Sequence, residues 1–130
     1  MKKILLPLAL LAILLSCNSG DSKDDKKEEE KTVPETVDLS KNPDYQKGLE
    51  IAAKSDCFTC HKVDESQPTG PAWREVANKY AGSDTAVSYL AKKIIAGGSG
   101  VWGTVPMAAH STFSQEDAEA VAKYVLLLKK

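Results

Sequence analysis

The sequence has 130 residues, 42% of them hydrophobic and 27% charged, which suits one small domain and excludes a large enzyme with a separate substrate domain. Its net charge of −1 is divided into +2 over residues 1–17, −4 over residues 18–40 and +1 over residues 41–130, so no zone is basic enough to predict a nucleic-acid partner. The only long apolar run lies at the N-terminus, which excludes a polytopic membrane protein.

Residues 1–16 have the pattern of a signal peptide. Two lysines precede an apolar run from Ile4 to Leu15, and a helix of this length would span about 18 Å, less than the roughly 30 Å of a bilayer core. A small residue, Ser16, then precedes Cys17, and this arrangement resembles the lipobox of bacterial lipoproteins. The resemblance implies that Cys17 becomes the lipidated first residue, with palmitate-type acyl chains. We therefore expect an exported protein, anchored by its lipid to a bacterial membrane on the periplasmic side. The alternative is an ordinary cleaved signal with an incidental cysteine.

Residues 17–40 predict a disordered, charged tether. The segment is rich in Asp, Glu and Lys and has almost no apolar residues, so it cannot bury enough surface to offset the entropy of ordering it. The tether could let a folded domain, residues 41–130, search for partners near the membrane. It could equally be a solvated spacer without a specific partner.

The folded domain is predicted to be all-α, with about four short helices. The first has Asn42 as its cap and runs towards Ser55, and the second follows Pro71 and ends at Gly82. A third starts at Ser83 or Asp84 and stops before Gly97, and a fourth starts at Ser114. No alternating strand pattern stands out, and residues 97–113 are predicted to form a long irregular loop. These helices offer few large apolar side chains, so we expect another group to fill the interior.

The chemistry is concentrated in a Cys-x-x-Cys-His motif at residues 57–61. Two thiols at this spacing, Cys57 and Cys60, can add to the vinyl groups of a haem while the adjoining His61 reaches the iron. A zinc ribbon would need a second Cys/His pair. A thioredoxin-type redox pair would follow a strand, and a plain disulfide would not require the histidine. The motif therefore predicts one covalently attached haem c.

A second axial ligand is needed on the other face of that haem. Besides Met1 the chain has one methionine, Met107, in a loop with glycine and proline that can approach a flat ligand closely. His110, three residues later, is the competing candidate.

The motifs together resemble the short bacterial class I cytochromes c of the c-551/c-552 group. They are the Cys-x-x-Cys-His motif, Gly-Pro-Ala-Trp at residues 70–73 and Gly-Val-Trp-Gly at residues 100–103 leading to Pro106 and Met107, with an amphipathic helix after them. The resemblance covers about residues 42–130. It implies the class I cytochrome c fold around one haem, with His61 and Met107 as axial ligands and thioether bonds from Cys57 and Cys60.

The resemblance also implies three supporting roles. The Pro71 carbonyl would accept a hydrogen bond from the His61 ring, while the Trp102 indole and Lys93, where the family often has Arg, would lie at a haem propionate. The sequence departs from the family after the methionine, where residues 108–110 are Ala-Ala-His instead of the usual Pro-Pro-Asn.

The function expected is a one-electron carrier that binds no small-molecule substrate and is not an enzyme. Its redox partners would be a cytochrome bc-type reductase or equivalent and a terminal oxidase or other reductase, docked through a small transient interface. Two alternatives remain open. One is a haem-based sensor or peroxidase-like enzyme with a labile methionine ligand, and the other is a fixed cytochrome subunit of an oxidase or reductase complex.

Overall fold

The structure, a computed structural model, describes residues 38–130. The predicted signal peptide, Cys17 and most of the predicted tether lie outside the described residues. The last two tether residues, Leu39 and Ser40, belong to a short 3-10 helix, Leu39–Lys41, whose first turn is capped by the Asp38 carboxylate. None of the helices within residues 38–130 is long and apolar enough to span a membrane.

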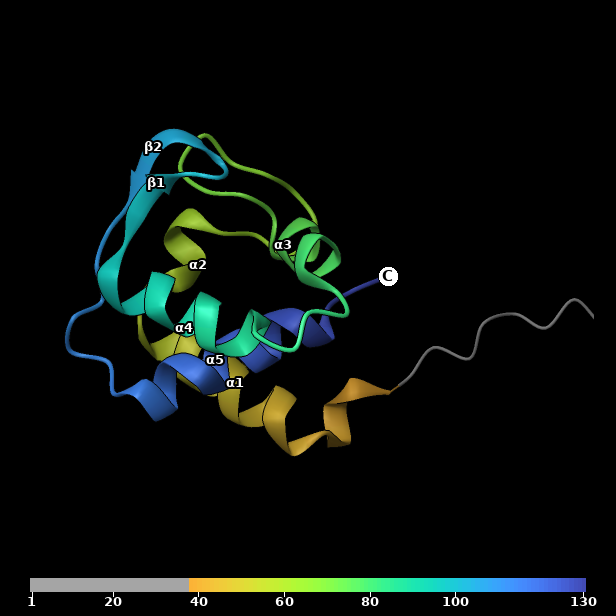
Figure 1. Ribbon diagram of the computed structural model, residues 1–130. Helices are drawn as coiled ribbons and strands as arrows, with labels where there is room; N and C mark the ends of the chain where they lie inside the picture. The colour runs from red at the N-terminus through yellow and green to blue at the C-terminus, as the bar shows by residue number, and fades with distance from the viewer. Residues whose placement is uncertain (1–37) are drawn as a thin grey trace, which may run out of the picture. The chain divides into compact units, whose positions relative to one another are not determined.

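The first and last helices, α1 (Pro43–Lys54) and α5 (Gln115–Leu127), pack against each other at the base of the fold (Figure 1). Each starts with a side-chain cap that the sequence predicts. The Asn42 side-chain oxygen accepts hydrogen bonds from two backbone N–H groups of α1, and Ser114 Oγ accepts from the Asp117 N–H at 3.0 Å. These caps satisfy N–H groups that have no partner within a helix.

Helices α3 (Trp73–Tyr80) and α4 (Ala86–Ala96) both pack against α5. Helix α3 occupies the predicted place after Pro71, whereas α4 begins slightly later than predicted because residues 83–85 form a turn, closed by the Ala86 N–H on the Ser83 carbonyl. A further single turn, α2 (Cys57–Cys60), is too short to have a periodic pattern and is not among the predicted helices.

The segment between α4 and α5 contains a β-hairpin, so the prediction of an irregular loop over residues 97–113 is wrong in its first half. Strand β1 (Gly98–Gly100) pairs with β2 (Gly103–Met107) in antiparallel register, with Gly98 opposite Met107. The reason lies in the burial pattern: every residue before Met107 in the two strands is exposed, so no side chains alternate between a core and a solvent face. The strands are defined by backbone pairing, which leaves no period-2 signal.

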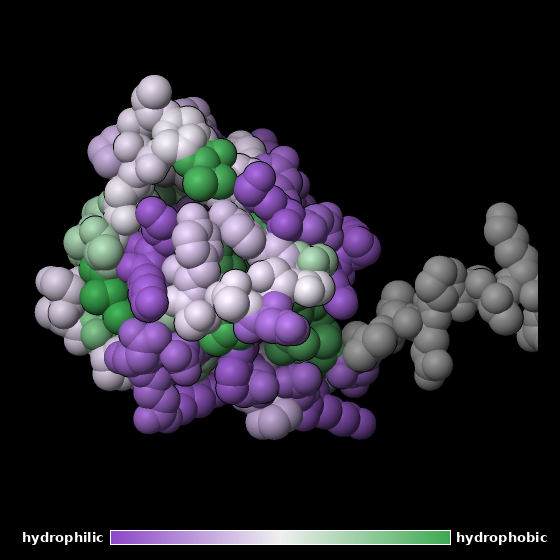
Figure 2. All heavy atoms as spheres, viewed as in Figure 1, coloured by the Kyte–Doolittle hydropathy of each residue, from purple (hydrophilic) through white to green (hydrophobic). Residues whose placement is uncertain are grey.

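The core is a cluster of small apolar residues around a few aromatic rings. Tyr124 of α5 is 1% exposed, and its ring meets Tyr45 of α1 and Trp73 of α3 edge-on, with ring centroids 5.0 and 5.5 Å apart. Within residues 38–130, the large hydrophobic side chains that are exposed, Val101, Trp102 and Val105, all belong to the hairpin. Elsewhere on the face shown in Figure 2, hydrophobic atoms form small patches within a mostly hydrophilic surface.

Candidate haem-binding site

A cavity of about 770 Å³ occupies the space between the helices, the loop after α2 and the hairpin. This volume is within the range of about 300–1,000 Å³ that takes cofactors and other small molecules. Apolar side chains of the core cluster, or packed against it, also line the cavity, including Val76, Leu90, Ile94 and Val125. The short helices thus leave a hollow where a larger protein would have side chains, as the shortage of large apolar residues predicts.

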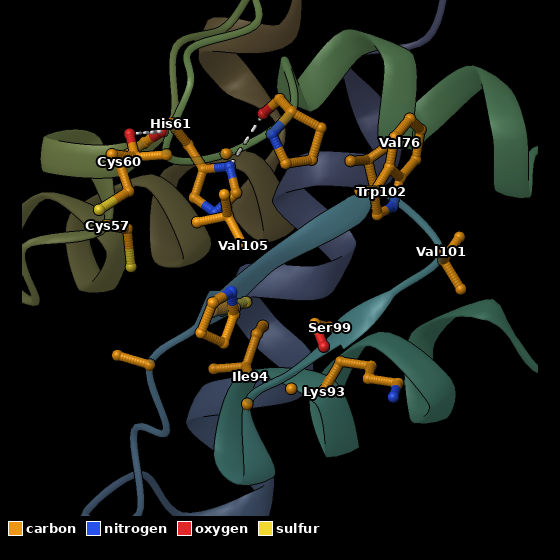
Figure 3. Close-up of a pocket in the computed structure, with 18 of the residues that line it drawn as sticks. Cys57, Cys60, His61, Val76, Lys93, Ile94, Ser99, Val101, Trp102 and Val105 are labelled. Atoms are coloured by element: carbon orange, nitrogen blue, oxygen red, sulfur yellow. Dashed lines mark hydrogen bonds between the residues drawn. The ribbon is translucent and has the colours of Figure 1, made fainter.

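All the cofactor-binding residues predicted from the sequence line this cavity: Cys57, Cys60, His61, Pro71, Lys93, Trp102 and Met107. The competing ligand His110 lines it too. Figure 3 shows Cys57, Cys60 and His61 on one side and Lys93 and Ile94 of α4 on the other, with the hairpin residues Val101, Trp102 and Val105 along the edge between them. Residues more than forty positions apart are therefore brought together around one apolar space.

The two cysteines are presented by the single turn α2 and are not joined by a disulfide. Cys57 is buried and Cys60 is exposed, and burial raises the pKa of the Cys57 thiol. The segment before them is a helix, α1, and not the strand that precedes a thioredoxin-type pair. Within residues 38–130 there is also no cluster of three or more His, Cys, Asp or Glu side chains that could hold a bare metal ion. The geometry disfavours the disulfide, zinc and thioredoxin alternatives.

The His61 imidazole is held in one orientation. Its Nδ1 lies 2.9 Å from the Pro71 carbonyl oxygen, and because a carbonyl only accepts, Nδ1 must carry the proton and donate it. In the neutral ring this tautomer leaves Nε2 without a proton, so that Nε2 can act as a ligand. The ring also stacks on Trp73, with centroids 5.8 Å apart and an interplanar angle of 21°. The contact with Pro71 that the family resemblance implies is present.

The loop that carries Pro71 is fastened at several points. Gln67 and Gly70 exchange backbone hydrogen bonds of 2.9 and 3.1 Å, and the Trp73 N–H donates to the Lys62 carbonyl at 2.9 Å. A Cβ on Gly70 would lie 2.8 Å from both the Cys60 carbonyl oxygen and the His61 Cε1. Only glycine lets this backbone approach the imidazole so closely.

Met107 is the last residue of β2 and is half-buried against the core cluster. The chain after Met107 is attached to α4 at His110, whose N–H donates to the Ile94 carbonyl at 3.0 Å. The His110 ring lies beside Phe113, with centroids 5.4 Å apart. The structure thus brings both candidate sulfur and imidazole ligands of the second face to the same cavity.

Trp102 and Lys93 lie at the edge of the cavity, each next to a residue that the sequence analysis did not assign to the site. Lys79 Nζ lies over the Trp102 ring at 5.6 Å from its centroid, and Lys93 Nζ lies 5.9 Å from the centroid of Tyr89. Tyr89 in turn packs on Tyr80, with centroids 5.4 Å apart, and both line the cavity. Burial, followed by the neighbouring Tyr89, raises the pKa of Tyr80 to about 12. The sequence could have pointed to Tyr80, because it continues the apolar spacing of its helix. No such spacing points to Tyr89.

Comparisons with known proteins agree on one family. Residues 45–129 match the family model described as Cytochrome c. The chain is 45% identical over 84 residues to cytochrome c-552 of Nitrosomonas europaea, covering 65% of this chain and 81% of that protein, and 44% identical over 80 residues to cytochrome c-552 of Hydrogenobacter thermophilus, covering 62% and 80%. The crystal structure of wild-type Nitrosomonas europaea cytochrome c552 superimposes with a TM-score of 0.58 at 44% identity, over 62% of this chain and 99% of that one.

The residues around the cavity fit a covalently bound haem. Two thiols and an oriented imidazole stand together at one wall, and the rest of the lining is mostly apolar, which is the donor set that a c-type haem needs. Proteins of this kind carry electrons and are not enzymes. The chain therefore belongs to the cytochrome c family, as a monohaem class I electron carrier of the c-551/c-552 type with its haem c attached through Cys57 and Cys60.

Proposed function

We propose that this cytochrome holds its haem iron between His61 and Met107 and carries single electrons between respiratory proteins at a bacterial membrane. The observation that carries the ligand assignment is the fixed His61 ring. Its Nδ1 proton is engaged by Pro71 at 2.9 Å, which leaves Nε2 to bind iron with the ring already oriented. Such a hydrogen bond also makes the ligating nitrogen more basic.

Met107 supports the second half of the assignment. It lines the same cavity as His61 and is half-buried against the core. Met107 itself is paired with Gly98 in the hairpin, and His110 after it donates a backbone hydrogen bond to Ile94 near the end of α4. A ligand held this way is ready to bind without a large rearrangement.

A His/Met pair determines what the protein can do. Bound haem supplies one-electron exchange between ferric and ferrous iron. Met107 as a ligand raises the reduction potential, and apolar residues such as Val76 and Ile94 raise it further by keeping water away. If His61 and Met107 both held the iron, a small-molecule substrate would have no access to the metal. This arrangement favours an electron carrier over the sensor or peroxidase-like alternative.

Partners would dock briefly near Cys60. This cysteine is exposed, whereas Cys57 is buried, so the attachment at Cys60 lies at the protein surface. Exposed lysines such as Lys54, Lys62 and Lys92 could contribute charges around a small redox interface. We propose a cytochrome bc-type reductase or equivalent as donor and a terminal oxidase or other reductase as acceptor.

The N-terminal segment would keep this exchange at the membrane. We propose that residues 1–16 are removed, that Cys17 is lipidated and that residues 17–40 are a tether that leaves the domain on the periplasmic side. The support is the sequence alone, with a short apolar run ending in Ser16 and Cys17. Attachment by several acyl chains is stable, whereas attachment by one is not.

The ligand assignment is tested by the visible spectrum of the oxidised protein. We expect the weak far-red band of a methionine sulfur on ferric haem at neutral pH. The Met107→Ala variant should keep its haem, because Cys57 and Cys60 are untouched, but lose the band and have a substantially lower reduction potential.

Three results would contradict the assignment. They are a wild-type spectrum without the band, a Met107→Ala potential equal to that of the wild type, and rapid binding of CO by the reduced wild-type protein at neutral pH. The last result would favour the sensor or peroxidase-like alternative.

A further inference from the structure

We propose that Gly97 is a positioning residue for the Met107 ligand, because the absence of a side chain there lets the end of α4 hold the Met107 segment at the cavity. The proposal rests on the assignment of Met107 as a ligand and adds what keeps it in place. Gly97 directly follows α4, and its N–H donates to the Lys93 carbonyl at 2.8 Å.

The contact between Gly97 and the Met107 segment is made of backbone on both sides. A Cβ built on Gly97 would lie 2.5 Å from the Met107 carbonyl oxygen, 2.9 Å from the Ala109 nitrogen and 3.0 Å from the Ala108 carbonyl carbon. Contacts shorter than 3.0 Å require something to move, and here no flexible side chain can yield. A methyl group at position 97 must therefore displace backbone.

The Met107 segment is the part that will move. On the α4 side, Ala91 is fully buried and Ile94 is 9% exposed, so the helix is fixed in the core. On the other side, Ala108 and Ala109 are exposed and lie outside regular secondary structure. Displacement of residues 107–109 is the less costly response, and it carries the Met107 side chain with it.

Two more contacts tie this segment to α4 and to the chain leaving it. Gly98 is paired with Met107 across the hairpin, and the His110 N–H donates to the Ile94 carbonyl at 3.0 Å. Met107 and His110 are thus both attached to the Ile94–Gly98 stretch, and Gly97 lies within that stretch. These two contacts and the close approach at Gly97 together form a clamp that holds residues 107–109. The clamp needs a residue without a side chain at position 97.

The backbone conformation of Gly97 would itself make an alanine there unfavourable. The experiment must separate this effect from the collision of the Cβ with residues 107–109. Its φ is +68°, which is unfavourable for an alanine wherever it occurs. Gly82, after α3, has a similar φ of +76°, and a Cβ there would meet nothing within 4 Å. Gly82→Ala therefore introduces an alanine at a similar positive φ without the collision, and it is the control for that part of the effect.

The experiment compares wild type, Gly97→Ala and Gly82→Ala as haem-loaded proteins, by the far-red band of the oxidised form and the rate of CO binding to the reduced form. We expect Gly97→Ala to lose most of the band at neutral pH and to bind CO about ten- to a hundredfold faster, the range that overpacking produces in a local equilibrium. Gly82→Ala should match the wild type in both. Equal behaviour of the two variants, with or without the band, would overturn the proposal.

A wild-type protein without the band would instead overturn the Met107 assignment itself, so the two failures are distinguishable. If Gly97→Ala yields no haem protein, a second pair tests the clamp at its His110 contact. His110→Pro removes the N–H that binds the Ile94 carbonyl, whereas His110→Ala removes the same imidazole and keeps the N–H. A weaker band in His110→Pro than in His110→Ala supports the clamp, and equal bands in the two variants contradict it.

Discussion

The phenol of Tyr124 is the most deeply buried large side chain of the described fold, at 1% exposure. Burial, with a smaller contribution from Tyr45, raises its pKa from 10 to about 12. The unfolded chain releases this proton near pH 10, while the folded chain keeps it until about pH 12. The folded state therefore binds more protons in this window, and the free energy of unfolding falls as pH rises through it.

We predict that Tyr124→Phe reduces this alkaline loss of stability and leaves the part that Tyr80, whose pKa is also raised to about 12, contributes over the same window. The wild-type contribution is complete below pH 10 and lost by about pH 12, and a shift of two pKa units corresponds to about 3 kcal/mol. Urea denaturation of the reduced protein, followed by far-UV circular dichroism at both ends of this window, measures the difference. If wild type and Tyr124→Phe lose the same stability over the window, the phenol is not the group responsible.

Single residues show how far the site could be predicted. The motif at residues 57–61 and Met107 could be identified because their chemical types mark them in the sequence, whereas the role of Pro71 came from the family resemblance. Tyr89 could not, because no local pattern distinguishes it and its place depends on how α4 turns towards Tyr80. Lys79 could not be predicted either, because it contacts the site only by lying over the Trp102 ring of the hairpin.

At the scale of elements, the crossing of α1 and α5 depends on Gly48. A Cβ there would collide with the Ala120 backbone carbonyl and with Tyr124 Cβ. We predict that Gly48→Ala lowers the free energy of unfolding by about 1–3 kcal/mol through overpacking, although alanine favours a helix by about 1 kcal/mol. Urea denaturation of the haem-loaded protein measures the change.

The control for Gly48 is Ala53→Gly, at an exposed position of the same helix. This variant measures helix propensity alone and should cost about 1 kcal/mol. A Gly48→Ala protein as stable as the wild type would mean that the two helices separate without cost, and the close crossing would not matter for stability.

The same elements divide into those that were predictable and those that were not. Helices α1, α3, α4 and α5 have apolar spacing and end signals, including the Asn42 and Ser114 caps, so their presence follows from local sequence. The hairpin does not, because Gly98 and Gly100 have no side chains to alternate and the strands pair through backbone alone. The missing signal matters for function, since the hairpin delivers Met107 to the cavity.

For the whole molecule, the fold and its cofactor explain each other. Short helices rich in alanine enclose a cavity of about 770 Å³ in place of a continuous side-chain core. The prediction of an all-α class I cytochrome c fold with one covalent haem is confirmed. It could be made because the shortage of large apolar residues and the haem-attachment motif lead independently to the same conclusion.

The arrangement of the full chain gives the last prediction, which concerns Cys17. If this cysteine carries the lipid, Cys17→Ser should move the protein from the membrane fraction to the soluble periplasmic fraction and abolish incorporation of labelled palmitate. Haem should stay attached, because the attachment site at residues 57–61 is unchanged, so haem absorbance follows the protein in both fractions. High-salt washing of wild-type membranes is the control, since attachment by several acyl chains resists it whereas electrostatic adsorption does not. Cys17→Ser that stays on washed membranes would show that something other than a lipid on Cys17 holds the cytochrome there.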